Sequence, residues 1–292
     1  MTPRALRTLS TLPALWRSSH PGPTVVVTVL AVVLGVSAGL DAARLALLGG
    51  AVFAGQLSVG WSNDAIDARR DAAVGRADKP IARGEISARA VGVAASVALV
   101  VALGMSAVLG PAFLGVHVVA LASAWSYNAW LKRTAASALP FAISFGLFPS
   151  LATLARADPL PATLWASAAG AMLGVAVHFS NVLPDLDDDA ATGIRGLPHR
   201  LGPRTSAVVA FVAVAAGAIA VAVGSVVPGS AGAGPAGIAP VVTAGLVIVL
   251  AIATAGLVRA VRRPDRTVFR LVMLAALVLA VQLAVAGVSV AA

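Results

Sequence analysis

The sequence predicts an all-α membrane protein with nine transmembrane helices and a cytoplasmic N-terminus. Composition, the length of the apolar segments and the distribution of basic residues predict this fold class. Of the 292 residues, 59% are hydrophobic and 11% are charged, whereas soluble domains carry about 25% charged residues. The mean hydropathy is +0.93. A bilayer-spanning helix needs about 20 mostly apolar residues, and such segments make up most of the chain.

Each of nine apolar segments is expected to form one helix. In order they cover residues 24–40, 45–62, 87–109, 112–130, 136–155, 160–183, 205–227, 237–258 and 268–290. When the loops alternate from a cytoplasmic N-terminus, only Arg44 and Arg156 of the 21 Lys and Arg residues fall outside. Cytoplasmic loops of membrane proteins carry the excess of Lys and Arg. The distribution therefore predicts the number of helices and their orientation in the cell membrane.

The composition also excludes several classes of function. No cysteine is present, which excludes disulfides, thiolate metal ligands and cysteine nucleophiles. The net charge of +9 could indicate nucleic acid, but no basic residues are interleaved with aromatic ones. Membrane orientation explains this charge better, so membrane lipid is an expected partner and nucleic acid is not.

Acidic residues gather directly after the second and the sixth apolar segments. Both segments run from outside to inside in the predicted topology, so both clusters emerge on the cytoplasmic side. One such cluster would ordinarily be a solvated loop, but two on the same side favour a paired site. Of the 12 acidic residues, these two clusters contain Asp64, Asp67, Asp71 and Asp78, and Asp185, Asp187, Asp188 and Asp189.

An Asn-Asp-Asp frame with i, i+4, i+8 spacing occurs in both clusters, and on a helix each triplet lies along one face. Each triplet follows a helix C-terminus, where the macrodipole disfavours anions, so a bound cation is expected. Oxygen ligands without cysteine are typical of Mg²⁺, which leaves positions for substrate phosphates. The two triplets are Asn63, Asp67 and Asp71, and Asn181, Asp185 and Asp189.

The first cluster fits the pattern N-D-x-x-D-x-x-x-D and the second fits D-x-x-x-D. Together they resemble the two signatures of the UbiA superfamily of intramembrane prenyltransferases. The stretch RADKPIARG over residues 76–84 is similar to the family's continuation, in which a basic residue precedes Pro and a Gly follows. Gly193 and the stretch GLPHRLG over residues 196–202 follow the second motif. The resemblance extends over essentially the whole chain.

The resemblance implies one UbiA-type domain over residues 1–292, with the helices around a central cavity open to the membrane. It implies Mg²⁺-dependent transfer of a prenyl group from a prenyl diphosphate to an aromatic or other lipophilic acceptor, at a site on the cytoplasmic side. Asp187 and Asp188 point off the ligand face and either support it or are solvated. The implied metal ligands are Asn63, Asp64, Asp67, Asp71, Asp185 and Asp189, of which the last four are the expected catalytic residues.

A diphosphate also needs cations from the protein. Lys132 follows Tyr127 and Asn128, similar to the family's Tyr-then-Lys segment. Positive-inside topology would place cations in these loops in any case, and we prefer that explanation for Arg69 and Arg70. The expected substrate-binding residues are Asn63, Arg76, Lys79, Tyr127, Asn128, Lys132, His178, Asn181 and Arg195.

Two predictions concern the sixth segment. His178 lies inside it, and a polar residue there either faces the cavity or makes a hydrogen bond between helices. Pro184 should kink the helix where the aspartates begin.

Three other functions stay open. Within the superfamily, the protein could be a terpene cyclase, or it could transfer a phosphoribosyl group to polyprenyl phosphate. A cation transporter is the alternative from another class, although transporters place their ion sites near the bilayer midplane.

Overall fold

The computed structural model describes residues 11–76, 78–186, 193–225, 238–262 and 266–286. Helices and no strands form over these ranges, as the sequence predicts. A short helix, Thr11–Arg17, precedes α2 and is bent from it by 67°. The α-helices are α2 Pro21–Ser37, α3 Ala42–Ala73, α4 Ala88–Leu109, α5 Pro111–Ala129, α6 Leu139–Leu154, α7 Leu164–Val182, α9 Leu197–Gly224, α10 Ile238–Arg262 and α11 Arg266–Ala286, with 3-10 turns η1 Leu131–Arg133 and η2 Leu183–Asp185.

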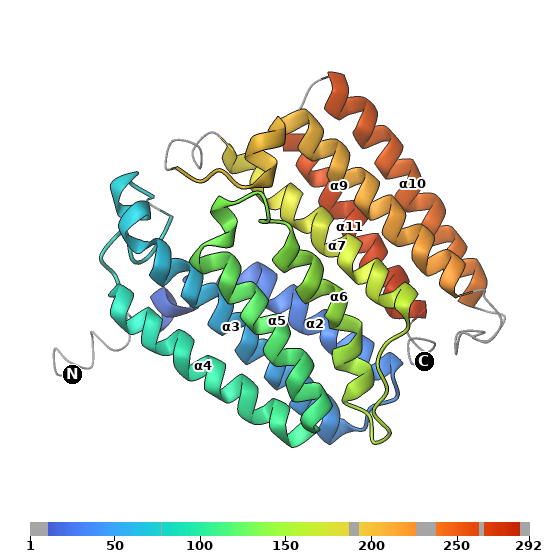
Figure 1. The fold of residues 1–292 in the computed structure, drawn as a ribbon, viewed down its shortest axis with the longest axis horizontal. Coiled ribbons are helices and arrows are strands. Elements are labelled where there is room, and N and C mark those ends of the chain that lie inside the picture. Colours follow the sequence, from blue (N-terminus) through green and yellow to red (C-terminus); the bar gives the residue numbers. More distant parts are fainter. Residues whose placement is uncertain (1–10, 77, 187–192, 226–237, 263–265, 287–292) are drawn as a thin grey trace.

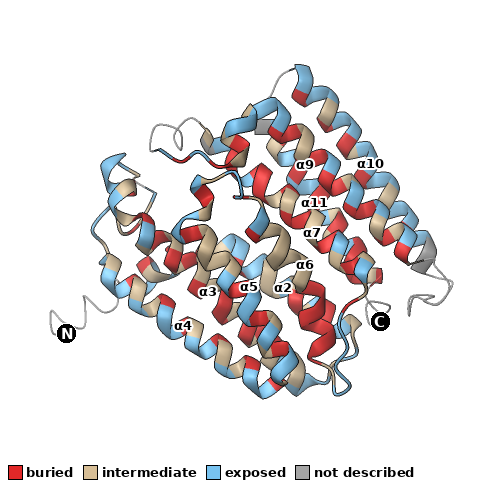
Figure 2. Cartoon of the chain, viewed as in Figure 1, coloured by how far each residue is buried: buried red, intermediate tan, exposed pale blue. Residues whose placement is uncertain are grey.

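Each of these α-helices overlaps one predicted segment. Within the described ranges, five helices are long and apolar enough to cross a membrane, or six if the bent pair counts as one span. Valines such as Val100 and Val108 on α4 and Val247 on α10 are exposed, as expected of side chains that face lipid. Figure 2 shows exposed positions along both of these helices. The count of nine spans and the cytoplasmic N-terminus stay predictions.

The largest difference from the sequence prediction is the length of α3. Its N-terminus is capped by Asp41, whose side chain accepts a hydrogen bond from the backbone N–H of Arg44 at 2.9 Å, as expected of an N-cap aspartate. The predicted segment ends at residue 62, but α3 continues to Ala73 and ends before Gly75, which has a φ of 70°. The triplet Asn63, Asp67 and Asp71 is therefore helical, as its spacing predicts.

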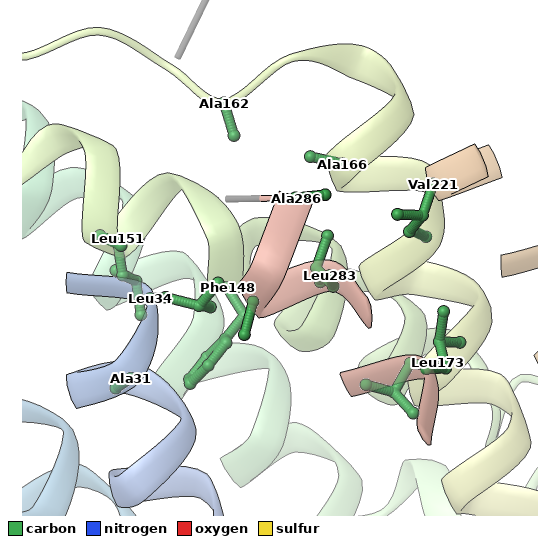
Figure 3. Packing of buried hydrophobic residues seen from close by; sticks show 14 of the residues in the cluster. Ala31, Leu34, Phe148, Leu151, Ala162, Ala166, Leu173, Val221, Leu283 and Ala286 are labelled. Carbon is green, nitrogen blue, oxygen red and sulfur yellow. The ribbon is translucent and has the colours of Figure 1, made fainter. Parts of the chain in front are cut away.

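The helices form two groups in Figure 1, with α4 and α10 at opposite edges of the bundle. Helices α3, α4 and α5 pack together on one side, and α7, α9, α10 and α11 on the other. Buried side chains join the groups (Figure 3), including Leu34 of α2, Phe148 of α6, Leu173 of α7 and Leu283 of α11. In α3 and α5 this cluster contains residues of the first half of each helix, such as Leu48 and Phe113, whereas the predicted site residues lie in the second half.

Small residues bring α6 and α7 into close contact. A Cβ atom on Gly174 would lie 2.3 Å from the carbonyl oxygen of Phe141, and one on Gly170 would lie 2.2 Å from that of Phe145. Such close helix approach through small residues is common in membrane bundles.

The second motif begins where α7 ends. Helix α7 stops at Val182, and the chain tightens into the 3-10 turn η2, which contains Pro184. The structure shows a change of helix type at Pro184, and the predicted kink stays a prediction. Helix α9 starts earlier than predicted, at Leu197, because a short turn precedes the break at Gly202, whose φ is 77°.

Candidate active site

The first acidic motif forms a buried row of carboxylates along α3. The side chains of Asp64, Asp67 and Asp71 are between 2% and 6% exposed. Buried carboxylates are stable only when they are paired with cations or well hydrogen-bonded. Each of the three is paired with a cationic side chain of the protein.

Asp67 has the most enclosed pair. Lys132 Nζ donates to Asp67 Oδ1 at 2.5 Å, and both side chains are at most 4% exposed. Arg70, one helical turn further along α3, donates to Asp67 Oδ2 at 3.0 Å and to Asp71 Oδ1 at 3.4 Å. One guanidinium therefore joins the second and third aspartates of the motif.

Asp64 faces a different pair of residues. Lys79 Nζ donates to Asp64 Oδ1 at 2.5 Å, and His20 Nε2 lies 2.9 Å from the same oxygen. Lys79 Nζ and His20 Nε2 are 3.2 Å apart. Lys79 belongs to the loop between α3 and α4, and His20 to the segment before α2. Two segments distant in sequence thus meet at one carboxylate.

Asn63 and Asn128 connect α3 with α5. Asn63 Nδ2 donates to Asn128 Oδ1 at 3.2 Å, and Asn128 Nδ2 donates to Ser62 Oγ at 2.8 Å and to the carbonyl of Val59 at 2.9 Å. Because these bonds fix the last turn of α5, they place the following turn η1, and with it Lys132, beside Asp67. This explains why Asn128 and Lys132 both belong near the motif.

His178 makes a hydrogen bond within the bundle, and its predicted contact with substrate stays a prediction. Its side chain is buried, and Nε2 lies 3.0 Å from Ser137 Oγ. Ser137 Oγ also accepts a hydrogen bond from the backbone N–H of Leu197 at 2.8 Å. The rings of Tyr127 and Phe141 pack against the imidazole. These contacts link the loop after η1, the end of α7 and the start of α9.

The remaining predicted residues are not gathered into this cluster. Arg76 pairs with Asp78 in the loop after α3, and its hydrogen bonds hold the pKa of Asp78 below the ordinary value. The side chains of Asn181 and Arg195 are exposed. Asp185 lies in η2, and its side chain is outside the described part of the structure, as are residues 187–192, including Asp187, Asp188 and Asp189.

Two residues of the cluster, His20 and Arg70, were not predicted. For Arg70, the i, i+3 spacing from Asp67 was an available signal, but positive-inside topology gave a sufficient explanation for any basic residue there. For His20 the sequence carries no signal, because its contact depends on the bend before α2.

The donor chemistry of the first motif fits Mg²⁺, which prefers carboxylate and amide oxygens. In the part of the chain that the structure describes, no three His, Asp or Glu side chains come close enough to hold a metal ion. The predicted ligand set also requires Asp185 and Asp189, whose side chains lie outside that part.

The apolar helical bundle and the row of paired carboxylates on α3 are the two features that the sequence led us to expect of an intramembrane prenyltransferase. The chain belongs to the UbiA prenyltransferase family, whose model matches residues 24–278. A comparison with curated proteins finds no match.

Solved structures share the fold. A UbiA homologue from Aeropyrum pernix K1 is 18% identical with a TM-score of 0.71, covering 89% of this chain and 96% of that one. A digeranylgeranylglyceryl phosphate synthase is 12% identical with a TM-score of 0.70, covering 95% and 98%. A UbiA homologue from Archaeoglobus fulgidus, bound to GPP and Mg²⁺, is 14% identical with a TM-score of 0.67, covering 95% and 100%.

Proposed function

We propose that this protein is a Mg²⁺-dependent integral-membrane prenyltransferase that moves a prenyl group from a prenyl diphosphate to an aromatic or other lipophilic acceptor. The observation that carries the proposal is the buried cluster on α3, in which Asp64, Asp67 and Asp71 lie within reach of Lys79, Lys132 and Arg70. Family membership supports the reaction class. The A. fulgidus homologue bound to GPP or DMAPP together with Mg²⁺ supports the donor substrate and the metal.

The residues of the cluster have separate roles in this proposal. Asn63, Asp64, Asp67 and Asp71, with Asp185 and Asp189 of the second motif, would hold Mg²⁺, which stabilises the charge that develops on a departing diphosphate. Lys79 and Lys132 are donors already fixed next to the carboxylates, so they can bind diphosphate oxygens at little reorganisation cost. Arg76 and Arg195, in the neighbouring loops, would add positive charge at the entrance.

The apolar part of the bundle has the complementary task. Breaking the allylic C–O bond leaves an allylic cation, and an acceptor that attacks it loses a proton and forms the product. Water would capture the same cation, so the site must exclude it. We place the reaction at the cytoplasmic ends of nine membrane-spanning helices in the plasma membrane, because both motifs emerge on the side that carries nearly all Lys and Arg residues.

The direct test is to incubate purified protein with geranyl, geranylgeranyl and longer prenyl diphosphates, with Mg²⁺ or with EDTA. Diphosphate release and lipid products are followed by mass spectrometry. Release that depends on Mg²⁺ and on an added membrane extract supports a transferase, and the product mass identifies the acceptor. Release without an acceptor, giving a terpene, would instead mean a cyclase.

Variants separate the site from the rest of the protein. Asp67→Asn should abolish diphosphate release, whereas Asp158→Asn, in an exposed pair with Arg156, should leave it unchanged. No turnover with any prenyl diphosphate, combined with ion flux by the protein in liposomes, would overturn the enzyme and favour the transporter.

A further inference from the structure

The segment before α2 packs against the acidic helix, although it lies outside the residues 24–278 that the family model matches. This segment, residues 11–20, consists of the helix Thr11–Arg17 and the turn that leads into α2. Ala14, Ser18 and Ser19 are completely buried. The segment is therefore docked on the protein and does not extend freely from it.

Specific contacts hold the segment on α3. Trp61 Nε1 donates to the carbonyl of Leu15 at 2.8 Å. A Cβ atom on Gly60 would lie 2.3 Å from the carbonyl oxygen of Ser19, so only glycine allows this approach of the two backbones. Arg17 forms an ion pair with Glu85 in the loop before α4. The segment thus bridges α3 and the loop that carries Lys79.

His20, at the end of the segment, reaches the acidic cluster. Its Nε2 atom lies 2.9 Å from Asp64 Oδ1 and 3.2 Å from Lys79 Nζ. Its backbone has a φ of 55° and a ψ of 68°, and among the described residues no other residue besides glycines has a positive φ. The left-handed conformation is unfavourable for residues with a Cβ atom. Such a residue keeps this conformation where surrounding contacts enforce it, often at functional sites.

We propose that His20 is a positioning residue of the diphosphate site and that residues 11–20 hold Lys79 in place for the substrate. The inference rests on the proposed function. A lysine side chain is flexible and loses much rotamer freedom when it is fixed. Contacts with both Asp64 and His20 fix the Lys79 ammonium before a diphosphate arrives. The His20 side chain is 39% exposed, so it borders the side from which a soluble group can approach.

The left-handed conformation of His20 allows a test that separates positioning from structural support. Glycine adopts positive φ without steric cost, which offsets the lost contact with Asp64, and Lys79 still pairs with that carboxylate, so His20→Gly should leave the melting temperature nearly unchanged. The same variant removes the contact with Lys79, so Kd for inorganic diphosphate with Mg²⁺ and KM for geranyl diphosphate should rise about tenfold, with a smaller change in kcat. His20→Gln keeps a hydrogen-bonding group and should stay within about threefold of the wild type.

A second variant tests docking without changing a polar side chain. Gly60→Ala should displace Ser19 and weaken diphosphate binding in the same direction as His20→Gly. Both variants act through the contact between His20 and Lys79. The double variant should therefore bind diphosphate no more weakly than whichever single variant has the lower affinity. Leu12→Ala is the matched control, since Leu12 is on the same short helix and is 63% exposed; it should behave as wild type.

The outcomes distinguish this inference from the proposed function. Binding is measured by calorimetry on the full chain in detergent, in parallel with turnover. If the wild type binds diphosphate and His20→Gly binds it equally well, the positioning role is wrong and the proposed enzyme activity is unaffected. Binding of diphosphate without turnover of any prenyl diphosphate would overturn the proposed function, and the role of His20 is then decided by binding alone. A wild type that binds no diphosphate contradicts both.

Discussion

Replacing Lys132 with methionine tests the most enclosed ion pair of the site. Methionine keeps an unbranched side chain of similar length but removes the ammonium that lies 2.5 Å from Asp67 Oδ1. Removing one partner of a buried ion pair costs about 3–5 kcal/mol, because it leaves a charge in the interior without compensation. Arg70 Nη2 stays 3.0 Å from Asp67, so we expect the lower end, a loss of about 3 kcal/mol in the free energy of unfolding.

The assay is equilibrium unfolding in mild detergent, followed by circular dichroism during titration with a denaturing detergent. Asp67→Asn is introduced alone and together with Lys132→Met to complete a double-mutant cycle. In the double variant the buried charge is gone as well, so about 2 kcal/mol of the loss should be recovered. If Lys132→Met unfolds like the wild type, or if the two losses simply add, the pair does not carry the stability assigned to it.

Three further variants test other parts of the structure. Ser137→Ala should destabilise the fold by about 2 kcal/mol in the same unfolding assay, because His178 and the N–H of Leu197 lose a buried partner. Gly174→Ala should cost about 2 kcal/mol through overlap with the Phe141 carbonyl, while Gly104→Ala, with nothing within 4 Å of its Cβ position, should not destabilise. Asp78→Asn should change the pH dependence. The Arg76 hydrogen bonds lower the pKa of Asp78 in the folded state below 3.8, so its contribution to stability is present above that pH and is lost as the pH falls through the folded value. In unfolding measurements from pH 3 to 7, Asp78→Asn should therefore be less stable than the wild type near neutral pH, and this difference should shrink at the acid end.

The helices could be predicted because lipid imposes a simple requirement on the sequence. A membrane-spanning segment must be apolar for about 20 residues, and each predicted segment overlaps one described α-helix. The largest difference, the end of α3, shows the limit of that signal. Hydropathy falls at Asn63, yet the backbone stays helical to Ala73, since the aspartates are stabilised by Lys79 and Lys132 from other segments and by Arg70 on α3 itself. Hydropathy records only burial in lipid and not burial in the protein.

The site was predictable in its composition but less in its pairing. The motif spacing identified Asn63 and Asp67, and the loops supplied Lys79 and Lys132 as candidate cations. Which cation meets which carboxylate depends on how the ends of α3 and α5 are packed, and on the hydrogen bonds of Asn128. His20 depends on a bend between two helices, which no local pattern in the sequence records.

The charge balance of the cluster explains why these pairings matter for function. Three carboxylates along two turns of one helix repel one another, and in a buried position their charges cannot be screened by water. Lys79, Lys132 and Arg70 compensate them, and the two lysines come from separate segments, so the same attraction that stabilises α3 also brings these hydrogen-bond donors together. Under the proposed function, a lysine at this site therefore has two roles that a single activity measurement mixes: it stabilises the aspartates and it binds diphosphate. Unfolding data separate the two roles. A lysine variant that unfolds like the wild type but binds diphosphate more weakly has lost only the second role.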